Sequence, residues 1–141
     1  MPPLPPAAFQ IKGQQFTYPA LLKRYQALFI DGILLLAVMI IIMVVTEDSP
    51  YHTEIMISTW LVCAFCYEPI LSAYSATIGQ RLMKIRVRNV DDPNVRILLG
   101  RAYLRFVVKG LLGWLSFVTI HSNPAHRAIH DYAGSSVVIN V

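Results

Sequence analysis

Charged residues are scarce in this sequence: Asp, Glu, Lys and Arg together make up 14% of the chain, where a typical soluble domain has about 25%. Hydrophobic residues reach 55%. The run LLLAVMIIIMVV is apolar on every helical face, and a chain of 141 residues has too little protein to bury it on all sides. This composition excludes an ordinary soluble domain and indicates a small integral membrane protein.

Recognisable enzyme motifs are also missing. The sequence has no GxSxG, no phosphate-binding loop and no HExxH. Its two cysteines, Cys63 and Cys66, lie in an apolar segment without a basic neighbour, so we interpret them as packing residues and not as a redox pair or a disulfide. We therefore expect a protein that is not an enzyme and that has no cofactor and no nucleic-acid partner.

A metal centre is not expected either. His121, His126 and His130 precede Asp131 at spacings that invite a metal site, but Pro124 interrupts the segment, so it does not form one continuous helix. We expect Asp131 to cap a turn or to pair with Arg127 or Arg101, which would hold this segment against the last strand.

Two long apolar segments, residues 27–45 and 55–73, predict transmembrane helices, because each approaches the roughly 20 residues that cross a hydrocarbon core. The loop between them, residues 46–54, contains acidic residues but no Lys or Arg, whereas basic residues precede the first segment and follow the second. The positive-inside rule then predicts a multi-pass protein of the inner cell membrane whose N-terminus and whose chain after residue 75 are cytoplasmic.

The rest of the chain divides into a proline-rich cytoplasmic tail, residues 1–17, and one membrane domain, residues 18–141. Alternation of apolar and polar residues predicts a short strand over residues 84–90, and a β-branched run predicts a second strand at the C-terminus. We expect these strands to pair as a small cytoplasmic β-ribbon. The fold class is thus a mostly α membrane protein with two transmembrane helices.

The hydrophobic segment of residues 97–120 leaves two geometries open. Arg101, Arg105 and Lys109 recur every four residues and form one basic stripe on a helix. The uninterrupted apolar part, residues 110–120, is too short to cross the membrane. The segment is either an amphipathic helix on the inner surface that leads into a re-entrant segment, or a third short membrane helix whose basic half faces protein.

Asp31 interrupts the first apolar segment, where a carboxylate costs roughly 2.5 to 3.5 kcal/mol and therefore requires a partner or a use. Asp31 lies about 10 Å deeper than Arg24, and Glu68 lies equally deep on the second segment, beside the helix-loosening Pro69. Both acids should meet counter-charges from the basic stripe. The predicted cluster consists of Arg24, Asp31, Glu68, Arg101, Arg105 and Asp131.

Three interpretations of this cluster remain open. It is an ion-pair network that holds the bundle together, a pathway for a proton or small cation, or part of a surface for anionic lipid or a protein partner. The basic residues of that surface would be Arg81, Lys84, Arg86 and Arg88. The expected partners are the lipid bilayer and either further copies of the chain or a larger membrane protein.

Three ordered blocks of sequence resemble the RDD membrane family, which is named for one arginine and two aspartates. RYQALFID at residues 24–31 resembles the family's R-x-x-A-x-x-x-D opening. YEP at residues 67–69, followed by TIGQRLMKIRV, resembles its T-x-G-K block, and HDYAGSSVV resembles its closing H-D-x-x-A-G-T-x-V-V. By this resemblance, Arg24, Asp31 and Asp131 are the name-giving residues.

The blocks depart from the family pattern at several positions. Gln80 stands where lysine is common, Lys84 where glycine is common, and residues 134–136 replace a small residue, Gly and Thr. The resemblance implies a multi-pass membrane protein, for which transport of an unidentified ligand is the usual suggestion. A transporter of a proton or small cation and a non-catalytic accessory or scaffold subunit are therefore the two functions to be distinguished.

Overall fold

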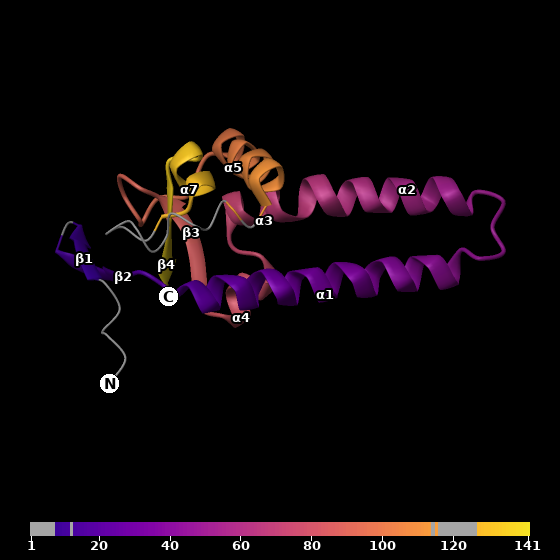
Figure 1. Cartoon of the computed structure of the whole chain (residues 1–141), viewed down its shortest axis with the longest axis horizontal. Coiled ribbons are helices and arrows are strands. Elements are labelled where there is room, and N and C mark those ends of the chain that lie inside the picture. Colours follow the sequence, from indigo (N-terminus) through magenta and orange to yellow (C-terminus); the bar gives the residue numbers. More distant parts are fainter. Residues whose placement is uncertain (1–7, 12, 114, 116–126) are drawn as a thin grey trace.

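A helical hairpin forms the long axis of the molecule in the computed structural model, which describes residues 8–11, 13–113, 115 and 127–141 (Figure 1). Its first arm is α1 (Leu21–Val45). The second arm is the interrupted helix α2 (His52–Val62), η1 (Cys63–Tyr67) and α3 (Glu68–Tyr74). Arms of 25 and 23 residues are long and apolar enough to cross a membrane, in agreement with the two predicted segments.

Most of the hairpin carries no protein cover. The buried residues of α1 are Arg24, Ala27 and Asp31, all in its first three turns, and α2 has no buried residue. Its remaining surface is apolar, with Leu36 and Ile41 about 60% exposed. Such a surface is stable only against lipid or other apolar groups.

The end of the hairpin opposite the α1–α2 loop carries the compact part of the fold. It is built from α4 (Ile78–Leu82), β3 (Ile85–Asn89), α5 (Leu99–Leu112), α7 (Ile129–Ala133) and β4 (Ser136–Asn140). The two strands pair antiparallel, with Val87 opposite Val138. This pairing confirms the predicted β-ribbon. Its valine face packs on α1, α3 and α5 in a small core made of Ala27, Ala73, Ile85, Val87, Ile97, Ala102 and Val138.

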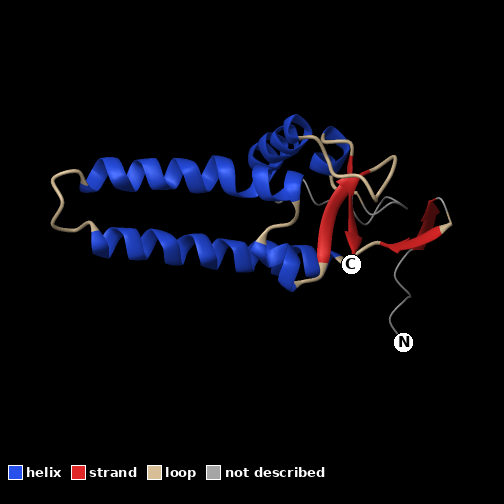
Figure 2. Cartoon of the chain, turned by 180° about the vertical axis from the view of Figure 1, so that it is seen from behind, coloured by secondary structure: helices blue, strands red, loops and turns tan. Residues whose placement is uncertain are grey.

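A hairpin that was not predicted, β1 (Ala8–Ile11) and β2 (Gln14–Thr17), lies within the segment assigned to the tail (Figure 2). Gly13 turns the chain with φ +78°, and Phe9 stacks on Phe16 and Tyr18 at centroid distances of 5.5 and 4.6 Å. The side-chain amide of Asn140 donates hydrogen bonds to the hydroxyl and the carbonyl of Thr17, which fastens this hairpin to the end of β4. The proline-rich residues 1–7 lie outside the described residues.

Helix α5 contains 14 residues, about 21 Å, and is too short to cross a bilayer. The predicted re-entrant segment, residues 110–120, lies outside the described residues at position 114 and from residue 116 onward. Arg105 is buried on the inner face of α5, whereas Leu104 and Leu111 are exposed.

Candidate functional site

The carboxylate of Asp31 receives three short hydrogen bonds at the junction of the two arms. Its Oδ1 accepts from the Tyr67 hydroxyl and from the Gly79 backbone N–H, both at 2.7 Å, and its Oδ2 accepts from Thr77 Oγ1 at 2.6 Å. Asp31 is 9% exposed. Among the described residues no cationic group lies within 4.0 Å of it. This buried acid is therefore held by neutral donors alone.

A glycine at position 79 allows α4 to approach Asp31. Thr77 caps α4, and Gln80 reaches back to the Thr77 backbone N–H, so the short helix is fixed at its first turn. A Cβ atom at Gly79 would overlap the carbonyl oxygen of Ala27 and lie 2.9 Å from Asp31 Cγ. The T-x-G block thus packs its backbone directly on the first helix and donates to Asp31.

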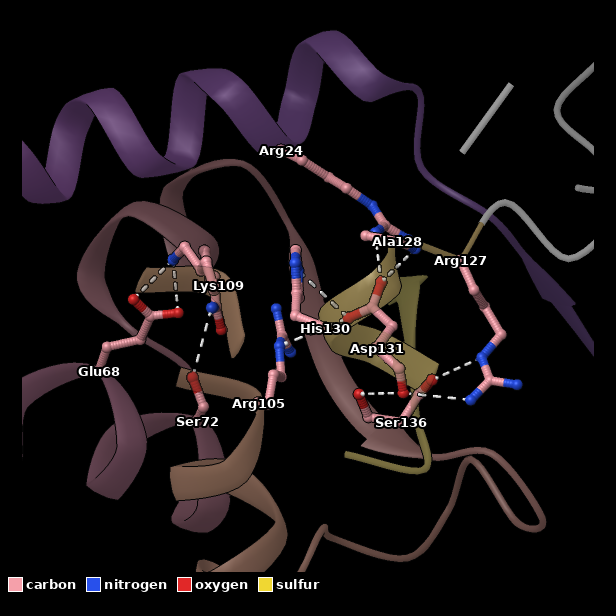
Figure 3. Close-up of polar contacts among 11 residues, drawn as sticks. Arg24, Glu68, Ser72, Arg105, Lys109, Arg127, Ala128, His130, Asp131 and Ser136 are labelled. Atoms are coloured by element: carbon pink, nitrogen blue, oxygen red, sulfur yellow. Dashed lines mark hydrogen bonds and ion pairs between the residues drawn. The ribbon is translucent and has the colours of Figure 1, made fainter. Parts of the chain in front are cut away.

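Asp131 forms a second, fully buried site with two arginines (Figure 3). Its Oδ2 lies 2.7 Å from Arg24 Nη1 and accepts from the Ala128 N–H at 3.0 Å, while its Oδ1 lies 3.4 Å from Arg105 Nε. Burial alone would raise the pKa of Asp131, but Arg105 and Arg24 outweigh it and hold the pKa below its ordinary value. The adjacent His130 is 1% exposed, and burial lowers its pKa to about 3, so this imidazole is neutral.

Glu68 forms the third site, at the point where the second arm changes geometry. The π-helical turn η1 ends at Tyr67, and α3 begins with Glu68 and the buried Pro69, which supplies no backbone N–H. Both carboxylate oxygens of Glu68 lie 2.6 Å from Lys109 Nζ of α5 (Figure 3). The helix is therefore irregular beside Pro69, as predicted. The side chain of Tyr67 contacts Asp31, and that of Glu68 contacts Lys109.

Two cavities adjoin these sites and share a wall. One has a volume of about 40 Å³, room for very few water molecules, and its charged and polar lining is Arg24, Asp31, Glu68, Gln80, Arg105, Lys109 and His130. The other, about 250 Å³, lies between the arms and is mostly apolar, with Leu35, Ala64 and Phe106 in its walls. Asp31 and Glu68 line both cavities. The two acids thus stand between a small space with several charged side chains in its lining and a larger, mostly apolar space.

The predicted cluster is assembled only in part. Arg24, Asp31, Glu68 and Arg105 line one cavity as expected, and Asp131 joins them through the two arginines. Arg101 does not line that cavity; it is half-buried and lies one turn before Arg105 on α5. Glu68 meets the predicted basic stripe through Lys109. The expected counter-charge of Asp31 needs correction, because the partners of its carboxylate among the described residues are neutral donors.

The predicted pairing of Asp131 also needs correction. Its carboxylate does cap a turn, through Ala128, but its ion-pair partners are Arg24 and Arg105. Arg127, one of the two predicted partners, donates instead to the backbone carbonyl oxygens of Asp131 and Ser136. The contact of Arg24 with Asp131 joins residues 107 apart in the sequence, so it has no signature in local spacing.

Five contact residues lie outside the predicted cluster, although one of them, Lys109, is expected as a counter-charge from the basic stripe. Lys109 belongs to the same stripe as Arg105, and Thr77 and Gly79 form the T-x-G block. Thr77, Gly79 and Tyr67 contact Asp31. Lys109 contacts Glu68, and His130 contacts Asp131.

Comparison with protein-family models matches residues 18–135 to the RDD family. The first two sequence blocks lie within that range, and the third, residues 130–138, begins in it. Neither the curated proteins nor the solved structures include a match to this chain.

Proposed function

The chain belongs to the RDD family, and from this membership and the buried cluster we propose that it is an integral membrane protein that moves a proton or a small cation by way of Asp31 and Glu68. The family is a membrane family, and the chain has two helices that satisfy the length and composition of membrane spans. The proposal of transport is supported by the buried acids Asp31 and Glu68.

The observation that carries the proposal is the position of Asp31 and Glu68 in the common wall of two cavities. An ionisable acid at membrane depth is costly and is typically retained on an ion or proton pathway. Asp131, by contrast, already has two guanidinium groups beside it. Asp31 has no cation within 4.0 Å among the described residues, so its charge is the one that an incoming proton or cation can neutralise.

Glu68 would be a second binding site for the transported proton or cation, and Lys109 already occupies it. The Lys109 ammonium touches both of its oxygens, so a proton or cation that reaches Glu68 competes with Lys109. Protonation of Glu68 would weaken that ion pair and release the Lys109 side chain. Among the described residues, Asp31 is thus a site without a counter-charge, and Glu68 is a site whose counter-charge is Lys109.

The membrane topology follows from charge placement. The N-terminus and the β-ribbon are cytoplasmic in this proposal, and the acidic loop after α1 lies outside. Two helices do not enclose a pathway, so the transporting unit contains several copies of the chain or a larger membrane partner.

Flux measurements in proteoliposomes test the proposal. The Asp31→Asn variant keeps the shape of the side chain but removes the titratable charge, so proton and cation flux should be lost while the thermal unfolding profile remains cooperative. Glu47→Gln, in the exposed loop at the other end of the hairpin, is the matched control and should retain flux. Equal flux in wild type and Asp31→Asn would refute transport through this site.

A second candidate function, an accessory subunit that binds a partner or anionic lipid, has its own support in the β-ribbon. Arg86 and Arg88 alternate with the buried Val87, and no carboxylate lies within 4.0 Å of them among the described residues. Burial, followed by repulsion from Arg86 and Arg96, lowers the pKa of Arg88. An anionic group would relieve this repulsion. The basic set to be tested is Arg81, Lys84, Arg86 and Arg88.

Co-purification from membranes tests this candidate. Replacing Arg81, Lys84, Arg86 and Arg88 by Gln should release a bound partner or anionic lipid without changing vesicle flux. Retention of every co-purifying component after the replacement would contradict the accessory role.

A further inference from the structure

The polarity of α5 is reversed with respect to a soluble amphipathic helix. Arg105 is 7% exposed on the inner face, and Lys109 is also turned inward, to Glu68. Leu104, Val107 and Leu111, which are three to four residues apart and share one side of the helix, are 50%, 48% and 81% exposed. A helix that turns its cations to the protein and its leucines away from it is suited to an apolar environment.

Two contacts fix the depth of α5 relative to the hairpin. The ring of Phe106 meets the ring of Phe65 edge-on, at a centroid distance of 5.9 Å, and Lys109 reaches Glu68. Phe65 and Glu68 belong to the second arm, within the 23-residue stretch that is apolar enough to cross a membrane. In Figures 1 and 2, α5 lies beside α3 and at an angle to α1 and α2. The second half of α5 is therefore level with the inner part of this arm.

We propose that α5 is embedded in the inner leaflet, with Leu104, Val107 and Leu111 against lipid acyl chains. The occupant is lipid because the neighbouring surface of the second arm is also uncovered: Phe65, on η1, is 49% exposed, and Ile70, on α3, is 36% exposed. The apolar surface of the arm and that of α5 lie at the same depth, and a bilayer that surrounds the arm also reaches α5.

Arg101 completes this assignment. It lies one turn before Arg105, toward the ribbon end of α5, and it is half-buried, with no carboxylate within 4.0 Å among the described residues. A guanidinium at the edge of an apolar helix face reaches the phosphate layer through its flexible stem. We assign Arg101 to a lipid phosphate, which gives this residue a contact outside the buried cluster.

Site-specific fluorescence quenching tests the depth of α5. A fluorophore is attached to Leu111→Cys in a chain whose Cys63 and Cys66 are replaced by Ala, in nanodiscs of phosphatidylcholine and phosphatidylglycerol. The label should be quenched several-fold more by nitroxides on lipid acyl chains than by aqueous iodide. The matched control, Asn94→Cys in the exposed loop after β3, should show the reverse order.

Two outcomes would overturn the proposal. Strong iodide quenching at position 111 would place this face in water. Protection from both quenchers would show that protein covers it, either a second copy or another part of the same chain. The outcome does not depend on ion flux, so the transport proposal can fail while this one holds.

The role of Arg101 is tested separately. The melting temperature of the wild-type protein should rise with the fraction of phosphatidylglycerol in the nanodisc, and Arg101→Gln should lose most of that rise. An undiminished rise in Arg101→Gln would remove the assigned phosphate contact.

Discussion

Arg24 and Asp131 are 107 residues apart in the sequence, yet Arg24 Nη1 lies 2.7 Å from Asp131 Oδ2 in the interior of the protein. Both side chains are almost completely buried, at 4% and 0% exposure. This pair joins the first turn of α1 to α7, and Arg105 joins α5 to the same carboxylate. Asp131 therefore holds three helices together, whereas Asp31 is held by neutral donors among the described residues.

Removing the charge of Asp131 should destabilise the protein severely. Asp131→Asn leaves Arg24 and Arg105 buried without an anion, and breaking a buried ion pair in this way typically costs about 3 to 5 kcal/mol. The measurement is the free energy of unfolding in mixed micelles, with Asp48→Asn in the exposed loop as the control. A loss below about 1 kcal/mol would contradict the assigned role.

A methyl group at position 79 should disrupt the contact between α4 and α1. In Gly79→Ala the new Cβ overlaps the Ala27 carbonyl and presses on Asp31, and neither backbone segment can move freely, so we expect a loss of about 3 kcal/mol or more. Gly32→Ala, one residue after Asp31, is the control: nothing lies within 4 Å of its added Cβ, and stability should be unchanged or slightly higher. Equal stability of the two variants would argue against the close approach.

The sequence predicted the elements better than the contacts between them. Both arms and the ribbon have continuous or periodic apolar patterns in the sequence, and such patterns predict helices and strands directly. The partners of the acids were only partly predicted, because the contacts of Asp131 with Arg24 and of Asp31 with Gly79 bring together distant segments. Backbone donors such as the Gly79 N–H leave no charge pattern in a sequence. The N-terminal hairpin was missed because Asn140, at the opposite end of the chain, fastens it.

Two residues flank the ribbon in a backbone conformation that favours glycine. Lys84 has φ +53° and Ser135 has φ +46°, and both stand where the resembled family pattern has glycine. A side chain in this region costs roughly 1 to 2 kcal/mol, partly offset by the entropy that glycine loses on folding.

Lys84→Gly and Ser135→Gly should therefore each raise the free energy of unfolding by about 0.5 to 1 kcal/mol. Thermal or denaturant unfolding of each variant measures the gain. Lys84→Ala is the control, since it removes the charge but keeps the Cβ, and it should show no gain. If Lys84→Ala gained as much as Lys84→Gly, side-chain charge and not backbone conformation would be the cause.

The stability of the protein should fall in mildly acidic solution because of His130. Burial lowers its pKa to about 3 in the folded state, whereas the unfolded chain has the ordinary value of 6.5. As the pH falls below 6.5 the unfolded state binds a proton first, so the stabilisation by neutral His130 is complete above that pH and is lost progressively toward pH 3. The slope approaches about 1.4 kcal/mol per pH unit, or up to about 2 kcal/mol between pH 6.5 and 5.

The difference in unfolding free energy between wild type and His130→Gln isolates this effect, because every other titrating group is common to both proteins. The wild type should lose stability faster than His130→Gln between pH 6.5 and 5. Asp131 cannot produce the same curve: its pKa is lowered by folding, so its contribution is complete above its ordinary value of 3.8 and is lost only below it. Parallel curves for the two proteins in this window would mean that His130 is not held neutral beside Asp131 and its arginines.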